Sequence, residues 1–153
     1  MSPTNAGQGA NGDRSEVEGL AHIAIAVHDA EPLITALVDA LGATRGEEEM
    51  LDGGALRVVF VRLGPVTFEL LEPRSPDHTV AKFLEKRGEG LHHVSLEVGD
   101  LERALAGCRY AGIQIIDETS RTGADGTQVA FLHPKSLGGV LLELCQAKDA
   151  DRS

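Results

Sequence analysis

The chain is poor in cysteine, in basic residues and in long apolar runs, and each shortage excludes a class of protein. Cys108 and Cys145 are too few for a disulfide framework, which favours the reducing cytoplasm as the location. Lys and Arg number 14 against 24 Asp and Glu, and the net charge of −10, with no basic stripe, argues against a nucleic-acid partner. No apolar run approaches the roughly 18–20 residues that span a bilayer, so no membrane segment is expected.

What is present suits one globular domain. With 153 residues, 42% of them hydrophobic, the chain is long enough for one core or for two fused half-domains. The polar, Gly-rich start lacks the apolar centre of a signal peptide. We predict a disordered tail (1–18), a single domain (19–147) made of a first module (about 19–72), a connector (73–90) and a second module (about 91–147), and a flexible tail (148–153).

An internal repeat is the most informative feature. The segments HIAIAVHDAE, starting at His22, and HVSLEVGDLE, starting at His93, share His, Val, Asp and Glu at matching positions. Further along each copy, a strand-like run carries one glutamate, Glu69 in FELL and Glu143 in LELC, after similar intervals. A duplication of this kind places one His and one Glu from each copy around a pseudo-twofold axis, which can build a two-His, two-carboxylate metal site.

Hydrophobic periodicity predicts the order β-α-β-β-β in both copies. The alternation of residues 20–27 indicates a strand whose bulky residues pack beneath a helix, while His22 lies on the more open face. Asp29 and Asp100 occupy N-cap positions of the helices that follow. The predicted helices are 30–41, 101–111 and a short one near 79–87; the strands that follow the long helices are 43–49, 55–62 and 65–72 in the first copy and 113–118, 127–132 and 139–146 in the second.

The two glutamates each need a cation, a partner or solvent. Glu69 and Glu143 stand in otherwise apolar strands, where an unpartnered carboxylate costs several kcal/mol. A lone His on a strand is usually a hydrogen-bonded structural residue, but four residues at equivalent points of two half-sheets indicate one site. The predicted metal ligands are therefore His22, Glu69, His93 and Glu143. This set suits a divalent first-row ion and does not choose among Co²⁺, Mn²⁺, Ni²⁺, Fe²⁺ and Zn²⁺.

The remaining histidines are assigned other roles. Only one of the neighbours His92 and His93 is expected to face the cavity, and the repeat aligns His22 with His93. His92 is then a structural residue or a hydrogen-bonding neighbour of the ligand. His28, His78 and His133 fall in turns or loops and are expected to be solvated.

These motifs resemble the vicinal oxygen chelate superfamily, which includes glyoxalase I, extradiol dioxygenases, fosfomycin-resistance enzymes and methylmalonyl-CoA epimerases. The stretches that look most like the epimerase family are HIAIAV (22–27), ELLEP (69–73), GEGLHHVSLEV (88–98) and FLHPKSLGGVLLEL (131–144). The resemblance spans about residues 20–147. It implies an α+β fold in which two tandem βαβββ modules form a curved mixed sheet around a metal site held by His22, Glu69, His93 and Glu143. Some epimerases have Gln where Glu69 stands.

The resemblance also implies a reaction. The chain would be a metal-dependent epimerase of methylmalonyl-CoA, in which the metal stabilises an enolate and two acid–base groups handle the proton at C2. Glu143 is the candidate catalytic residue for one face. The second group is unassigned: some bacterial members carry Glu where Val58 stands, the run 47–49 is typical of a solvated acidic edge, and a metal-bound water is a further alternative.

Ligand-binding residues and alternatives complete the prediction. Lys135 and Arg57 are the predicted substrate-binding residues, followed by Arg62 and Arg74, and no Gly-rich phosphate loop is present. Family likeness implies Co²⁺ first, with Mn²⁺, Ni²⁺ or Zn²⁺ as alternatives, and a homodimer. The competing functions are a glyoxalase I-type lyase acting on a glutathione hemithioacetal and a non-catalytic small-molecule binder of the same fold. Such binders generally lack the metal ligands, and extradiol dioxygenases use one carboxylate fewer.

Overall fold

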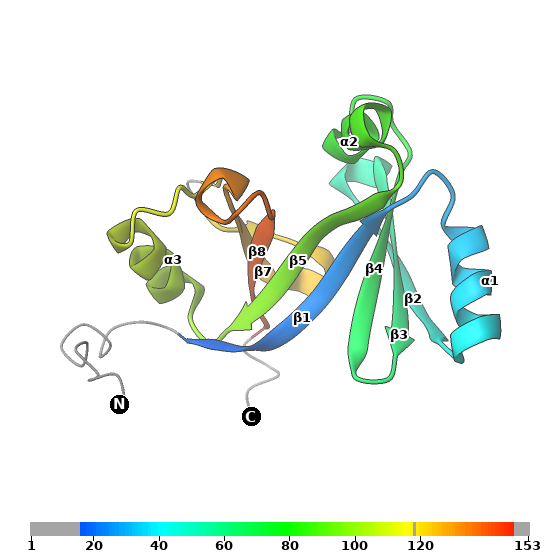
Figure 1. The fold of residues 1–153 in the computed structure, drawn as a ribbon, viewed down its shortest axis with the longest axis horizontal. Helices are drawn as coiled ribbons and strands as arrows, with labels where there is room; N and C mark the ends of the chain where they lie inside the picture. Colours follow the sequence, from blue (N-terminus) through cyan, green and yellow to red (C-terminus); the bar gives the residue numbers. More distant parts are fainter. Residues whose placement is uncertain (1–15, 118, 149–153) are drawn as a thin grey trace, which may run out of the picture.

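The computed structural model describes residues 16–117 and 119–148. Each module contributes one long helix and a set of strands, and short 3₁₀ turns (η) join some of the strands (Figure 1). In chain order the elements are β1 (Val17–Ala26), α1 (Ala30–Leu41), β2 (Thr44–Leu51), η2 (Asp52–Gly54), β3 (Leu56–Leu63), β4 (Val66–Pro73), α2 (Thr79–Arg87), β5 (Gly90–Val98), α3 (Leu101–Tyr110), β6 (Arg121–Thr122), η3 (Ala124–Gly126), β7 (Gln128–Leu132), η4 (Pro134–Ser136) and β8 (Leu142–Gln146).

The described strands form one mixed sheet with a symmetric order, β2-β3-β4-β1-β5-β8-β7-β6. The first strands of the two modules, β1 and β5, pair antiparallel at its centre. Each also pairs in parallel with the last strand of its own module, β1 with β4 and β5 with β8. Figure 1 shows the sheet curling, with α1 on the outer side of one half and α3 on the outer side of the other. This confirms the predicted α+β fold of paired modules.

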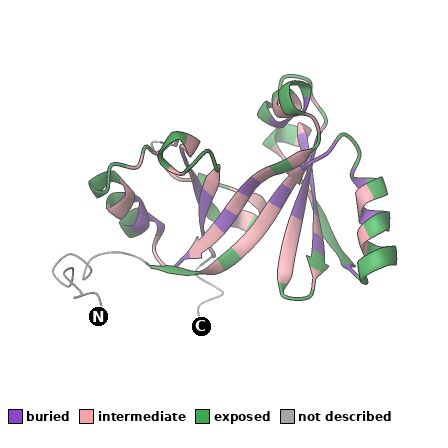
Figure 2. Ribbon diagram, viewed as in Figure 1, coloured by how far each residue is buried: buried purple, intermediate pink, exposed green. Residues whose placement is uncertain are grey.

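The core divides according to the two faces of the central strands. Val27 and the half-buried Ile25 pack with Ile34 of α1, as the alternation predicts. Val98 packs in the same way beneath α3. On the opposite face, Ala24 is buried in a cluster with α2, so the connector helix covers part of that face. Figure 2 shows the result: buried residues follow the strands, and most of α1 is exposed.

Side-chain caps set the helix boundaries. Asp29 accepts a hydrogen bond from the Glu31 backbone N–H, and Gly42 ends α1 in the left-handed conformation with a φ of 67°. Asp100 caps α3 by accepting from the Arg103 N–H. The predicted helices 30–41 and 79–87 are confirmed, and α3 ends one residue before the predicted position 111. None of the described helices combines the length and the apolar character that a membrane crossing requires.

Some predicted boundaries in the second module are wrong. Residues 113–117 do not form a strand; only Ile115 among them makes an isolated bridge, to Leu132, and residue 118 lies outside the described residues. The reason is Asp117, whose carboxylate accepts the Phe131 N–H at 2.7 Å and so replaces a backbone carbonyl of the ladder. The strand predicted at 139–146 begins at Leu142, because Gly138 and Gly139 have positive φ angles.

The domain limits shift slightly. β1 begins at Val17, inside the stretch predicted as the N-terminal tail. The rest of that tail, residues 1–15, and residues 149–153 of the predicted C-terminal tail lie outside the described residues.

Candidate functional site

The four predicted ligands come from the four central strands. His22 lies on β1, Glu69 on β4, His93 on β5 and Glu143 on β8. The parallel registers are equivalent in the two modules: Glu69 pairs with Ala24 on β1, and Glu143 pairs with Ser95 on β5, two residues after the respective His. The repeat therefore places all four residues on one face of the sheet.

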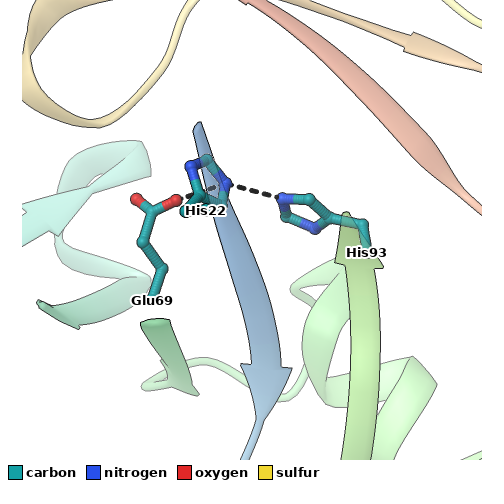
Figure 3. A group of neighbouring side chains, drawn as sticks. All are labelled: His22, Glu69 and His93. Atoms are coloured by element: carbon teal, nitrogen blue, oxygen red, sulfur yellow. Dashed lines mark hydrogen bonds and ion pairs between the residues drawn. The ribbon is translucent and has the colours of Figure 1, made fainter. Parts of the chain in front are cut away.

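Their donor atoms converge (Figure 3). His22 Nε2 contacts Glu69 Oε2 directly and lies 3.1 Å from His93 Nε2. Glu143 completes the group, with Oε1 at 3.5 Å from His22 Nε2 and Oε2 at 3.7 Å from His93 Nε2. The ligand atoms of His22, Glu69 and His93 all lie within 4.8 Å of one another. The structure thus brings together the predicted set, two imidazoles and two carboxylates.

The site is buried, and burial changes its acid–base properties. Glu69, His93 and Glu143 are 4%, 5% and 6% exposed. Burial, and then the charges of His22, His92 and Arg121, lowers the pKa of His93 to about 2, so its imidazole is neutral. Burial raises the pKa of Glu143, although the charge of His22 and a hydrogen bond from Ser95 Oγ at 2.8 Å oppose the rise.

This donor set fits a divalent metal ion. Two imidazole nitrogens that face each other at 3.1 Å need either a proton or a cation to offset their lone pairs. Adjacent ligand atoms that each lie about 2.1 Å from a metal ion are about 3 Å apart, close to this spacing. The two carboxylates supply the negative charge that offsets a divalent ion in a buried place.

His92 departs from the prediction that only one of the neighbouring histidines faces the cavity. The register of β1 with β5 shifts between Ala24↔His93 and Ile25↔Leu91, so His92 is the extra residue of a β-bulge and its side chain also lines the cavity. Its Nδ1 lies 2.8 Å from His93 Nδ1. A metal ion bound at His93 Nε2 would place the proton of His93 on Nδ1, where it could be donated to His92 Nδ1 and hold the ring.

The four side chains open into a cavity of about 600 Å³. Its walls are mainly apolar residues of β3, β4 and β7, and Val58 is among them. The Asp125 N–H donates to Glu49 Oε2 at 2.8 Å and so joins the two edges of the curled sheet. Arg121 is the one Lys or Arg among the described lining residues. Sequence reasoning missed Arg121, because β6 has no strong periodicity and the residue has no partner in the repeat.

The histidines predicted to be solvated differ from one another. His28 is exposed, as expected. His78 contradicts the prediction: its side chain is 12% exposed, its Nδ1 caps α2 by accepting from Val80 N–H, and its Nε2 bonds Asp52 at 2.7 Å. His133 is half-buried and caps η4 by accepting the Lys135 N–H. Both are helix caps, a role that the turn-rich sequence around them conceals.

The predicted substrate-binding residues do not lie in the cavity. Arg57 is buried and turned to the other side of the sheet, where its guanidinium donates to Glu31, Glu48 and Glu72. The assignment of Arg57 to substrate binding is therefore wrong, because three carboxylates already occupy its donors. Lys135 is exposed on η4 and lines neither of the two cavities found in the described residues.

Comparison with known proteins agrees with this geometry. The sequence model of the glyoxalase/bleomycin resistance protein/dioxygenase superfamily matches residues 21–131. The mitochondrial methylmalonyl-CoA epimerase of Bos taurus is 42% identical over 129 residues, which are 84% of this chain and 74% of that protein. The crystal structure of methylmalonyl-CoA epimerase from Mycobacterium tuberculosis aligns with a TM-score of 0.83 and 33% identity, covering 90% of this chain and 93% of the other.

A further solved structure, a methylmalonyl-CoA epimerase in complex with methylmalonyl-CoA and NH₄⁺, aligns with a TM-score of 0.81 and 28% identity over 88% of this chain and 97% of that one. The chain therefore belongs to the glyoxalase/bleomycin resistance protein/dioxygenase superfamily. Within that superfamily, it is a member of the methylmalonyl-CoA epimerase family.

Proposed function

We propose that the protein interconverts (R)- and (S)-methylmalonyl-CoA with a divalent metal ion held by His22, Glu69, His93 and Glu143. The convergence of these four side chains at the wall of one cavity carries the proposal. The relatives support it, because the Bos taurus and Mycobacterium tuberculosis proteins are methylmalonyl-CoA epimerases and a third was solved with methylmalonyl-CoA. Co²⁺ as the ion, the cytoplasmic location and the homodimer stay predictions.

The reaction needs a proton removed from C2 and returned to the opposite face. A divalent ion at this site supplies Lewis-acid stabilisation of the negative charge that develops on nearby substrate oxygens. Glu143 is the proposed acid–base group, because its carboxylate lines the cavity beside the proposed metal site and a carboxylate can take and return a proton. Ser95 holds Oε1 of this carboxylate by its 2.8 Å hydrogen bond, and the apolar walls of β3 and β4 exclude water.

Arg121 is proposed to bind the free carboxylate of the methylmalonyl group. Its guanidinium stacks over the Phe131 ring, 5.1 Å from the centroid, and Phe131 in turn contacts His93 with ring centroids 5.0 Å apart. The positive charge therefore stands one aromatic ring away from the proposed ligands. The Arg121 charge offsets the repulsion between the anionic acyl group and a protein of net charge −10.

Metal binding can be measured without catalysis. We expect Co²⁺ or Mn²⁺, added to about 100 times its Kd, to raise the Tm of chelator-treated protein by about 5–10 °C, because the ion binds the folded state only. His22→Ala should abolish the shift. His28→Ala, which removes an exposed His outside the cavity, should keep it. An equal shift in the His22 and His28 variants would contradict the ligand assignment.

Turnover is tested by proton–deuterium exchange at C2 of methylmalonyl-CoA in D₂O. We expect exchange in the metal-restored protein and a loss of at least about a hundredfold in the metal-free protein, because the enolate then lacks its counter-charge. Mass spectrometry of the recovered thioester gives the rate. Equal exchange without metal would refute the proposed metal dependence, and turnover of a glutathione hemithioacetal alone would favour the glyoxalase function.

A further inference from the structure

A second cavity of about 420 Å³ adjoins the first at the proposed metal ligands. The two share Thr79, His92, His93 and Leu141 as a common wall. Its remaining lining comes from α2, from the start of β5, from η4 and from the segment between η4 and β8; these residues are Lys82, Phe83, Lys86, Arg87, Leu91, Pro134, Gly139 and Val140. The two cavities therefore adjoin beside the proposed metal ligand His93.

Three cations of α2 line this second cavity, which we call the α2 groove. Lys82 and Lys86 stand one helical turn apart, and the Arg87 guanidinium lies over Phe83 at 5.5 Å from the ring centroid. No ion pair within the described ranges 16–117 and 119–148 involves any of the three. In a chain of net charge −10, this makes the groove a local positive surface.

The fold alone does not account for these charges. Lys86 and Arg87 suit the negative end of the helix dipole, but Lys82 stands in the first half of α2, and like charges at i and i+4 destabilise a helix. The groove also exposes large apolar side chains: Leu91 is 58% exposed and Val140 is 44% exposed. Positive charge beside exposed apolar surface matches a ligand with both phosphates and an apolar arm.

We infer that the α2 groove binds the nucleotide end of the acyl-CoA, with Lys82 and Lys86 on its phosphates and the pantetheine arm along Leu91 and Val140. This inference rests on the proposed function, since it assumes that the acyl thioester occupies the first cavity. The residues common to both cavities, His92 and His93 among them, then lie near the point where the thioester meets the arm. Lysine is suited to this role because its compact ammonium binds phosphate as a point charge.

The double variant Lys82→Ala/Lys86→Ala tests the inference by kinetics. At low salt we expect KM for methylmalonyl-CoA to rise about tenfold, with kcat within twofold, because the two charges act on binding and not on C2. With methylmalonyl-pantetheine, which lacks the nucleotide, the variant and the parent protein should have equal KM. Arg109→Ala, which removes an exposed charge at the end of α3 outside both cavities, should leave both values unchanged.

A binding measurement separates this inference from the proposed function. Adenosine 3′,5′-bisphosphate, which carries the 3′-phosphate and the inner 5′-phosphate of coenzyme A without any acyl group, should bind the parent protein in calorimetry and bind the double variant about tenfold more weakly. That difference would support the groove even if the protein had no epimerase activity. Equal binding of the nucleotide by both proteins, or an equal rise in KM for the truncated thioester, would overturn the inference.

Discussion

Replacing Glu143 by glutamine is expected to lower kcat for epimerisation by at least about a hundredfold, the range that a general acid–base group contributes. Glutamine keeps the shape of the side chain and still accepts a hydrogen bond from Ser95 Oγ, but it cannot take or return a proton. Steady-state kinetics on (R)- and (S)-methylmalonyl-CoA, with the metal content of each sample, gives the measurement.

Two results would contradict this role for Glu143. One is a Glu143→Gln variant with activity within threefold of the parent. The other is full recovery of activity in excess metal, which would make Glu143 a ligand and not an acid–base group. Glu97→Gln is the matched control, because it removes a carboxylate that lines the same cavity from β5 and should retain activity within threefold.

The candidate site was predictable because the two copies of the repeat have the same strand register. A parallel pair within each module sets Glu69 beside Ala24 and Glu143 beside Ser95. Since Ala24 and Ser95 each lie two residues after the repeated His, the alternation of a strand puts each His and its Glu on one face. The alternation of residues in the strands, together with the repeat, therefore suffices to predict that all four side chains lie on one face of the sheet.

The parts that were not predictable depend on side chains that break this symmetry. Asp117 replaces a backbone carbonyl and removes a strand that the first module keeps. A bulge turns His92 toward the cavity against the alternation. Arg121 lies on a two-residue strand, where periodicity has no signal. Residues that bind the substrate are also expected to differ between the two modules. The two ends of an asymmetric thioester need different partners on the two sides of a symmetric site.

Arg57 illustrates how a plausible binding residue belongs to the fold. Its Nη1 donates to Glu72 at 3.0 Å, its Nη2 to Glu31 at 2.9 Å and its Nε to Glu48 at 2.5 Å. Glu72 is buried and also accepts the Ala30 N–H at 2.9 Å, at the start of α1. Hydrogen bonds from Arg45 and then Arg57 lower the pKa of Glu31 to about 2. The cluster therefore joins α1 to β2, β3 and β4.

We expect Arg57→Met to lower the free energy of unfolding by about 3 kcal/mol, because it leaves the buried Glu72 carboxylate without its main counter-charge. In a chain of this size the loss corresponds to a Tm lower by about 6–12 °C in calorimetry. Arg45→Met, which breaks only an exposed pair with Glu31, should cost less than about 1 kcal/mol.

The double variant Arg57→Met/Glu72→Gln separates lost attraction from an unpaired charge, because the glutamine oxygen still accepts the Ala30 N–H. It should recover much of the lost stability, since removing both members of a buried pair is often close to neutral. KM for methylmalonyl-CoA should stay within twofold in all of these variants, because the cluster lines neither cavity within the described residues. If Arg57→Met raised KM and left Tm unchanged, Arg57 would be a substrate-binding residue after all. A fall in Tm with unchanged KM would leave substrate binding to Arg121 and the cations of α2.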